Sequence, residues 1–127
     1  MMPAVAKLFL ILGSINAMLA VVLGAFGAHG LKKILTPELL TTFATGVQYH
    51  FYHAIGLIVV GLVAFHLPAS MQLRLSGWLM LAGIVLFSGS LYLLAVTGIR
   101  WLGAVTPLGG VCFIIAWAML ALAVVKT

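Results

Sequence analysis

Long apolar stretches separated by short polar connections dominate the pattern of this chain. The apolar stretches cover residues 5–28, 49–67, 75–96 and 102–125. Each reaches or approaches the roughly 20 residues that an α-helix needs to cross about 30 Å of hydrocarbon. Because lipid offers the backbone no hydrogen-bonding partner, open-ended segments of this kind adopt helices. The pattern predicts an all-α membrane protein, a four-transmembrane-helix antiparallel bundle that forms one integral membrane domain over residues 1–127.

The connection between the first two stretches has the pattern of an amphipathic helix. Thr36 is a typical N-cap, and Pro37 and Glu38 suit the first helical turn. The apolar residues that follow fall on one face, namely Leu39, Leu40, Phe43 and Val47. We expect an amphipathic interfacial segment between the first and second membrane spans that continues into the second.

The composition supports a membrane location. Hydrophobic residues make up 65% of the chain and charged residues 6%, with a mean hydropathy of +1.35. A soluble domain carries about a quarter charged residues. Too few polar side chains are present to cover a globule in water, so the apolar surface must meet lipid or protein.

The charges are few and mostly positive. Six basic residues and one acidic residue, Glu38, give a net charge of +5. The basic residues stand at the ends of the apolar stretches, where they anchor helices at the level of the lipid headgroups. A nucleic-acid binder would gather them on one face, so the expected partner is membrane lipid and not nucleic acid. Three basic residues fall on each predicted membrane face, and the positive-inside rule therefore leaves the orientation open.

Polar residues gather where the predicted spans meet one membrane face. His29 ends the first span, and Thr106 lies near the start of the fourth. The others lie near the start of the second span or the end of the third: Gln48, Tyr49, His50, His53, Ser88, Ser90 and Tyr92. In antiparallel spans all of them fall in the same half of the bilayer, so we expect one polar cluster built from all four helices. Asn16 lies deeper and should turn inward to bond a neighbouring helix.

This polar cluster has three interpretations. It can be a structural core whose hydrogen bonds hold the helices together. It can be a pocket for a small molecule or a quinone, or it can be a metal or haem site. His29, His50 and His53 are the candidate metal ligands, because neutral imidazoles suit zinc, copper or haem iron. The sequence identifies no particular cofactor.

Catalytic residues are not predicted. No carboxylate lies inside a predicted span, which disfavours an ion-coupled transporter, and no GxSxG-like elbow accompanies the serines. Cys112 is the only cysteine, which excludes disulfides and paired redox cysteines within one chain. Pro107, about two turns into the fourth stretch, predicts a kink or a local opening of that helix, a feature that some transporter sites share.

Four short motifs occur together in the order found in one family: residues 24–29 (GAFGAH), 48–53 (QYHFYH), 86–92 (LFSGSLY) and 106–110 (TPLGG). On these motifs the chain resembles the YgdD/YwdK-like small membrane proteins, which carry a domain of unknown function and are similar to animal transmembrane protein 256. The resemblance implies four spans, the inner membrane for a bacterial source, and no established activity or site residue. Such relatives tend to carry more basic residues on the face of the termini, which implies cytoplasmic termini and a histidine cluster that faces outward.

Together these features favour a multi-pass membrane protein that acts without catalysis, as a binding or accessory module. A haem-, metal- or quinone-binding protein associated with redox chemistry is the alternative. A small-solute channel or transporter is the second alternative. The small residues Ala20, Gly24 and Ala28, four apart, permit close helix packing, either within the chain or in a homo-oligomer or with a membrane-protein partner.

Overall fold

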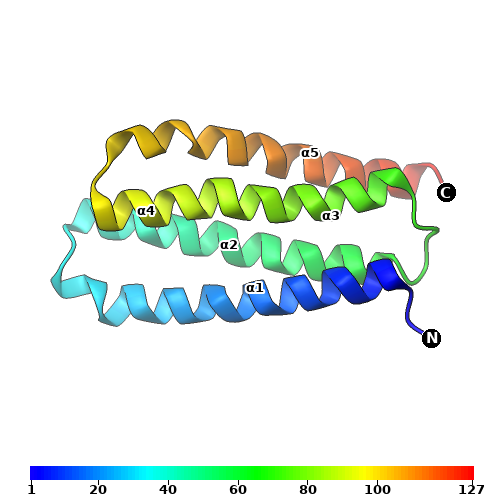
Figure 1. Cartoon of the computed structure of the whole chain (residues 1–127), viewed down its shortest axis with the longest axis horizontal. Helices are drawn as coiled ribbons and strands as arrows, with labels where there is room; N and C mark the ends of the chain where they lie inside the picture. Colours follow the sequence, from blue (N-terminus) through cyan, green and yellow to red (C-terminus); the bar gives the residue numbers. More distant parts are fainter.

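A computed structural model describes all residues from Met1 to Thr127. Its elements in chain order are α1 (Ala4–His29), η1 (Leu31–Lys33), α2 (Pro37–Val63), α3 (Met71–Gly83), η2 (Ile84–Ser88), α4 (Gly89–Thr97), η3 (Arg100–Ala104) and α5 (Thr106–Val125). Because α3, η2 and α4 follow one another without a break, the chain forms four long rods that lie side by side, with both termini at the same end (Figure 1). Each rod contains a helical stretch long and apolar enough to cross a membrane. The predicted all-α fold with four membrane-spanning helices is confirmed.

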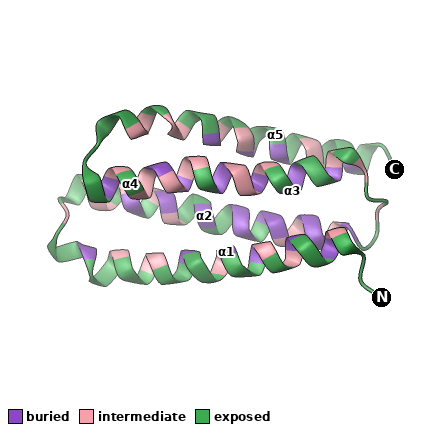
Figure 2. Cartoon of the chain, viewed as in Figure 1, coloured by how far each residue is buried: buried purple, intermediate pink, exposed green.

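The rods pack in a row and not in a closed square. α1 packs against α2, α2 packs against α3, η2 and α4, and α3 packs against α5. α1 and α5 lie at the two outer edges of the view (Figure 1). Burial accordingly concentrates on α2 and the third rod, while α1 and α5 are mostly exposed (Figure 2). The exposed side chains of these outer helices are largely apolar, which is the surface that lipid covers in a membrane protein.

The second rod begins at Pro37, twelve residues before the start of the apolar stretch that predicted it. Thr36 caps this helix, because its hydroxyl accepts a hydrogen bond from the backbone N–H of Leu39 at 3.2 Å. The predicted amphipathic segment therefore continues into the second span, as expected, but it does so as one straight helix that lies along α1.

Three threonines in the first turns of α2 have hydrogen bonds that make them compatible with the apolar interior of a membrane. The hydroxyls of Thr41, Thr42 and Thr45 each donate to the carbonyl four residues earlier, at 3.0, 3.2 and 3.0 Å. A threonine bonded in this way has satisfied its donor inside its own helix, so it needs no partner from water. Because threonine counts as polar in the hydropathy pattern, the predicted apolar stretch begins at residue 49, whereas α2 begins at Pro37.

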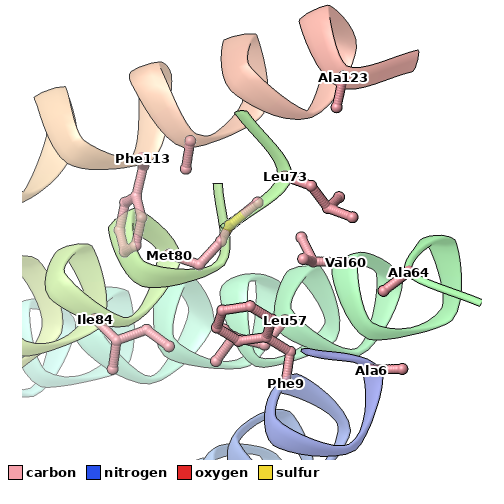
Figure 3. Close-up of a cluster of buried hydrophobic side chains, with 11 residues drawn as sticks. Ala6, Phe9, Leu57, Val60, Ala64, Leu73, Met80, Ile84, Phe113 and Ala123 are labelled. Atoms are coloured by element: carbon pink, nitrogen blue, oxygen red, sulfur yellow. The ribbon is translucent and has the colours of Figure 1, made fainter. Parts of the chain in front are cut away.

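The main apolar core lies toward the end that carries the termini. Eleven buried residues from all four rods form it, among them Phe9, Leu57, Met80 and Phe113 (Figure 3). A much smaller cluster of Leu31, Phe43 and Ala95 lies at the opposite end, near the η1 loop. The two ends of the bundle are therefore packed differently, with the denser apolar core at the termini.

A turn of π-helix, η2, interrupts the third rod, and the first turns of α5 pack against it. Such a turn holds one extra residue and shifts the faces of the helix on either side of it. Gly109 of α5 lies directly on the backbone here: a Cβ atom added to it would clash with the Phe87 amide nitrogen and would lie 2.7 Å from the Phe87 Cα. Only a residue without a side chain permits this approach.

Pro107 does not kink the fourth span from within. It occupies the first turn of α5, and a 3₁₀ turn, η3, together with Val105 precedes it. The span is thus locally opened, as expected, but at a helix boundary. Proline suits the first turn of a helix, where its missing N–H would have no intrahelical partner.

A glycine-to-alanine pair on α5 tests the close contact with the π-turn. We expect Gly109→Ala to lower the free energy of unfolding by about 1–3 kcal/mol, the usual cost of forcing an extra carbon into a packed interior. Gly110→Ala is the matched control, since its added Cβ would lie 3.9 Å from the Phe87 ring and alanine favours the helix. Reversible unfolding in mixed detergent micelles, followed by circular dichroism, measures both. Equal stability of the two variants would contradict the contact.

Candidate functional site

A buried hydrogen-bonded chain joins three of the four rods. The Nδ1 atom of His50, on α2, lies 2.8 Å from the Tyr92 hydroxyl oxygen on α4. The Nε2 atom of the same ring lies 3.0 Å from Oδ1 of Asn16 on α1. Asn16 in turn donates through Nδ2 to the Leu12 carbonyl at 2.8 Å. His50 and Asn16 are buried, so this polar chain crosses the interior of the bundle.

The chemistry of the end groups determines the direction of these bonds. The Leu12 carbonyl only accepts, so the amide of Asn16 directs Nδ2 to Leu12 and leaves Oδ1 as the acceptor for His50. Nε2 of His50 must therefore carry the proton. In the neutral ring Nδ1 then holds the lone pair, and the Tyr92 hydroxyl donates to it. Each ring nitrogen of His50 therefore has a hydrogen-bond partner, Tyr92 for Nδ1 and Asn16 for Nε2.

His50 lies at the middle of its helix and not near one membrane face. It stands thirteen residues from each end of α2 (Pro37–Val63), which is about 20 Å of helix on either side. Asn16 occupies the corresponding middle position of α1. The sequence placed His50 one to two turns into its span because it started that span too late. Asn16 does turn inward to bond a neighbouring helix, as expected.

His53, one turn after His50, has a different environment. Its Nδ1 lies 2.7 Å from the Tyr49 carbonyl, to which it must donate. Its ring stacks on Phe113 of α5, with centroids 3.4 Å apart and planes inclined by 6°. Nε2 makes no hydrogen bond within the chain and is not completely enclosed. His53 therefore keeps one free lone pair, on the tautomer opposite to that of His50.

Two serines connect further helices. Ser88, in the π-turn, donates to the Gly46 carbonyl of α2 at 2.7 Å. Ser90 lies 2.6 Å from the Thr106 hydroxyl of α5, and it donates to the Phe87 carbonyl at 2.9 Å. The predicted polar residues on the third and fourth rods therefore do meet their neighbours, but as separate small groups rather than as one pocket.

Three of the predicted site residues stay outside these groups. His29 is exposed in the last turn of α1. Gln48 is exposed and donates to the hydroxyl of Tyr52 at 2.6 Å, along the same face of α2. Tyr49 is 36% exposed and packs its ring on Phe87, with centroids 4.5 Å apart. His29 thus does not join His50 and His53, and no three histidine, cysteine or acidic side chains come together in a way that could hold a metal ion.

Ser76 makes an interhelical contact that the sequence pattern did not predict. Ser76 of α3 is completely buried and donates to the Ala116 carbonyl of α5 at 2.7 Å. The spacing of apolar residues in the sequence could have indicated this burial, since Ser76 lies on the same helical face as the buried residues Leu73 and Met80. With this contact included, every fully buried polar side-chain atom has a hydrogen-bond partner within the chain.

The fold and these contacts define a multi-pass membrane protein whose four helical spans are joined by buried hydrogen bonds. Residues 23–110 match the family described as "Protein of unknown function (DUF423)", and the chain belongs to that family. It is 60% identical over 120 residues to the UPF0382 membrane protein YwdK of Bacillus subtilis, across 94% of this chain and 98% of the relative. A UPF0382 membrane protein of Staphylococcus epidermidis is 49% identical, across 94% and 97% of the two chains. The predicted resemblance to YwdK-like membrane proteins is confirmed, and no solved structure matches the chain.

The two tautomers can be tested by spectroscopy. In protein labelled with ¹⁵N-histidine, we expect His50 to carry its proton on Nε2 and His53 to carry its proton on Nδ1. Two-dimensional NMR of the ring nitrogens distinguishes the two forms, and His50→Gln and His53→Gln variants assign the signals. Tyr92→Phe should shift the His50 Nδ1 signal and leave that of His53 unchanged. A His50 ring protonated on Nδ1 alone would contradict the hydrogen-bonded chain.

Proposed function

We propose that this protein acts without catalysis, as an accessory module that associates with other membrane proteins or with itself, and that its polar residues serve to hold its helices together. The observation that carries this proposal is the complete internal pairing of its fully buried polar side-chain atoms. A group that acts on a substrate needs an open position for the substrate or its proton. Both ring nitrogens of His50 are already used.

The charges support the same proposal. Glu38 is the only carboxylate side chain, and it lies in the first turn of α2, where a negative charge stabilises the helix end. No acid therefore accompanies the histidines as a proton relay would require. The wide apolar faces of α1 and α5, at the outer edges of the row, are surfaces on which another membrane helix can pack.

The two alternatives have narrower support. A redox-associated protein that binds haem, a metal or a quinone would depend on His53. Among the ring nitrogens of His50 and His53, only Nε2 of His53 has no hydrogen bond within the protein. A channel or transporter would depend on the interruption at Pro107, which lies at a helix start and is explained there by ordinary helix geometry.

Photo-crosslinking in native membranes tests the accessory role. A photoreactive amino acid replaces Met18 on α1 or Ile114 on α5, which are 58% and 71% exposed, and the buried Leu57 serves as the control. We expect a protein adduct of one defined mass from at least one exposed position and none from Leu57. If both exposed positions yield lipid adducts alone, and the purified chain is monomeric, the accessory role is wrong.

The same purified protein tests the alternatives. Under the accessory proposal it is colourless and free of metal and quinone after growth in metal-replete medium. A Soret band, bound metal or bound quinone that is lost in His53→Ala would replace the proposal with the redox alternative. Solute flux through liposomes that Pro107→Ala abolishes would replace it with a channel.

We also propose a bacterial inner membrane location with both termini in the cytoplasm. Both termini lie at one end of the bundle (Figure 1), and the family resemblance favours a cytoplasmic face for that end. In a Cys112→Ala background, a membrane-impermeant maleimide should label Ile34→Cys in intact cells. It should label Ala69→Cys, in the connection at the end of the termini, only after lysis. The reverse pattern would show the opposite orientation.

A further inference from the structure

A groove lies between the last turns of α1 and the first turns of α2, apart from the polar chain around His50. Its volume is about 450 Å³, which falls in the range of pockets that hold small organic ligands. Gly24, Gly27 and Ala28 form the α1 side, and Phe43 and Val47 lie on the α2 side. The lining is almost wholly apolar, except for one charged side chain at its end.

The groove follows from the small residues of the first family motif. Gly27 lies against the ring of Phe43, because a Cβ atom added to it would come within 2.8 Å of the ring. A Cβ atom added to Gly24 would lie 3.2 Å from Cγ1 of Val47. The absence of side chains at these two positions lets α1 approach α2. Ala28 on α1 and Ala44 on α2 are exposed, so their short side chains leave the groove open toward the surrounding lipid.

Lys32 provides the charge at the end of the groove. It belongs to η1, the short turn that directly follows α1, and it lines the groove together with the apolar residues. This is the level of the lipid headgroups, because the apolar span ends here. Lys33 stands beside it, and the chain has a single acid, Glu38. One carboxylate cannot neutralise two lysines, so this end of the groove keeps a positive charge that an anion complements.

We propose that this groove binds one anionic phospholipid of the surrounding membrane, with an acyl chain along Gly24 and Gly27 and the phosphate on Lys32. The apolar length of the groove suits a hydrocarbon chain, and the ammonium at the headgroup level suits the phosphate. A lipid held here contacts both α1 and α2. The proposal does not depend on the accessory role, since none of the residues in the polar chain lines the groove.

Native mass spectrometry of the full chain in detergent tests this site, with phosphatidylglycerol and phosphatidylcholine of identical acyl chains as probes. We expect one phosphatidylglycerol to be retained in preference to phosphatidylcholine. Lys32→Gln should weaken phosphatidylglycerol binding about fivefold, the effect of one lysine near an anionic headgroup. Lys33→Gln is the matched control, because Lys33 is equally charged and does not line the groove. Inorganic phosphate at millimolar concentration should not displace the lipid.

A second pair of variants tests the acyl-chain position. Ala44→Leu fills the groove from an exposed position and should reduce retention of both lipids. Ala25→Leu is its control, because Ala25 is exposed on α1 and lies outside the groove. Both substitutions lie on the lipid-facing surface, so the fold tolerates them.

Three results would overturn the site. The first is equal loss of phosphatidylglycerol in Lys32→Gln and Lys33→Gln, which would indicate general surface charge. The second is unchanged lipid retention in Ala44→Leu. The third is a dimer of the chain that Ala44→Leu disrupts while lipid retention stays constant, which would show that a second copy occupies the groove.

Discussion

The imidazole of His50 connects three helices in the middle of the bundle, and the register of these helices depends on it. Tyr92 donates to one ring nitrogen and Asn16 accepts from the other. In hydrocarbon an unpaired imidazole, amide or hydroxyl is costly to bury. Sliding α1 or α4 along α2 by one turn, about 5.4 Å, would leave such groups unpaired. These bonds therefore act mainly on register. Their net contribution to stability is modest, about 0.6 kcal/mol each on average in membrane proteins.

Close contact between backbones supplies the attraction that the hydrophobic effect cannot provide between helices in lipid. Gly13 of α1 shows this, because a Cβ atom there would lie 2.9 Å from the Ala54 carbonyl oxygen of α2. Gly109 performs the same role between α5 and the π-turn. The serines then use the carbonyls that these approaches bring near, as Ser88 does with Gly46 and Ser76 with Ala116.

The sequence was sufficient for the number and direction of the spans, because hydropathy measures transfer into lipid directly. It was weaker on which polar side chains face inward. Successive helical residues point about 100° apart, so Tyr49 and His50 differ in burial although they are neighbours. The start of α2 lies twelve residues before the predicted one, which is about three turns, so the depth expected for His50 was wrong by that amount. The π-turn shifts the face of Tyr92 relative to α3. Its residues, Ile84–Ser88, include no proline that would indicate an interrupted helix. His29 shows the remaining difficulty, since a residue at the end of a span can turn either way.

The distribution of polar and small residues gives the two ends of the bundle different properties. The large apolar core fills the end of the termini, while the opposite end has a small cluster and the groove beside Lys32. His50 lies between these two ends and connects α1, α2 and α4. At Gly24 and Gly27 the separation of α1 from α2 is set by packing against Val47 and Phe43. The hydrogen bond from His50 to Asn16 lies two to three turns away from these glycines. Beyond Asn16 no buried hydrogen bond joins α1 to α2. Toward η1 these two helices are therefore held together by the contacts of their small residues and by the short connection between them.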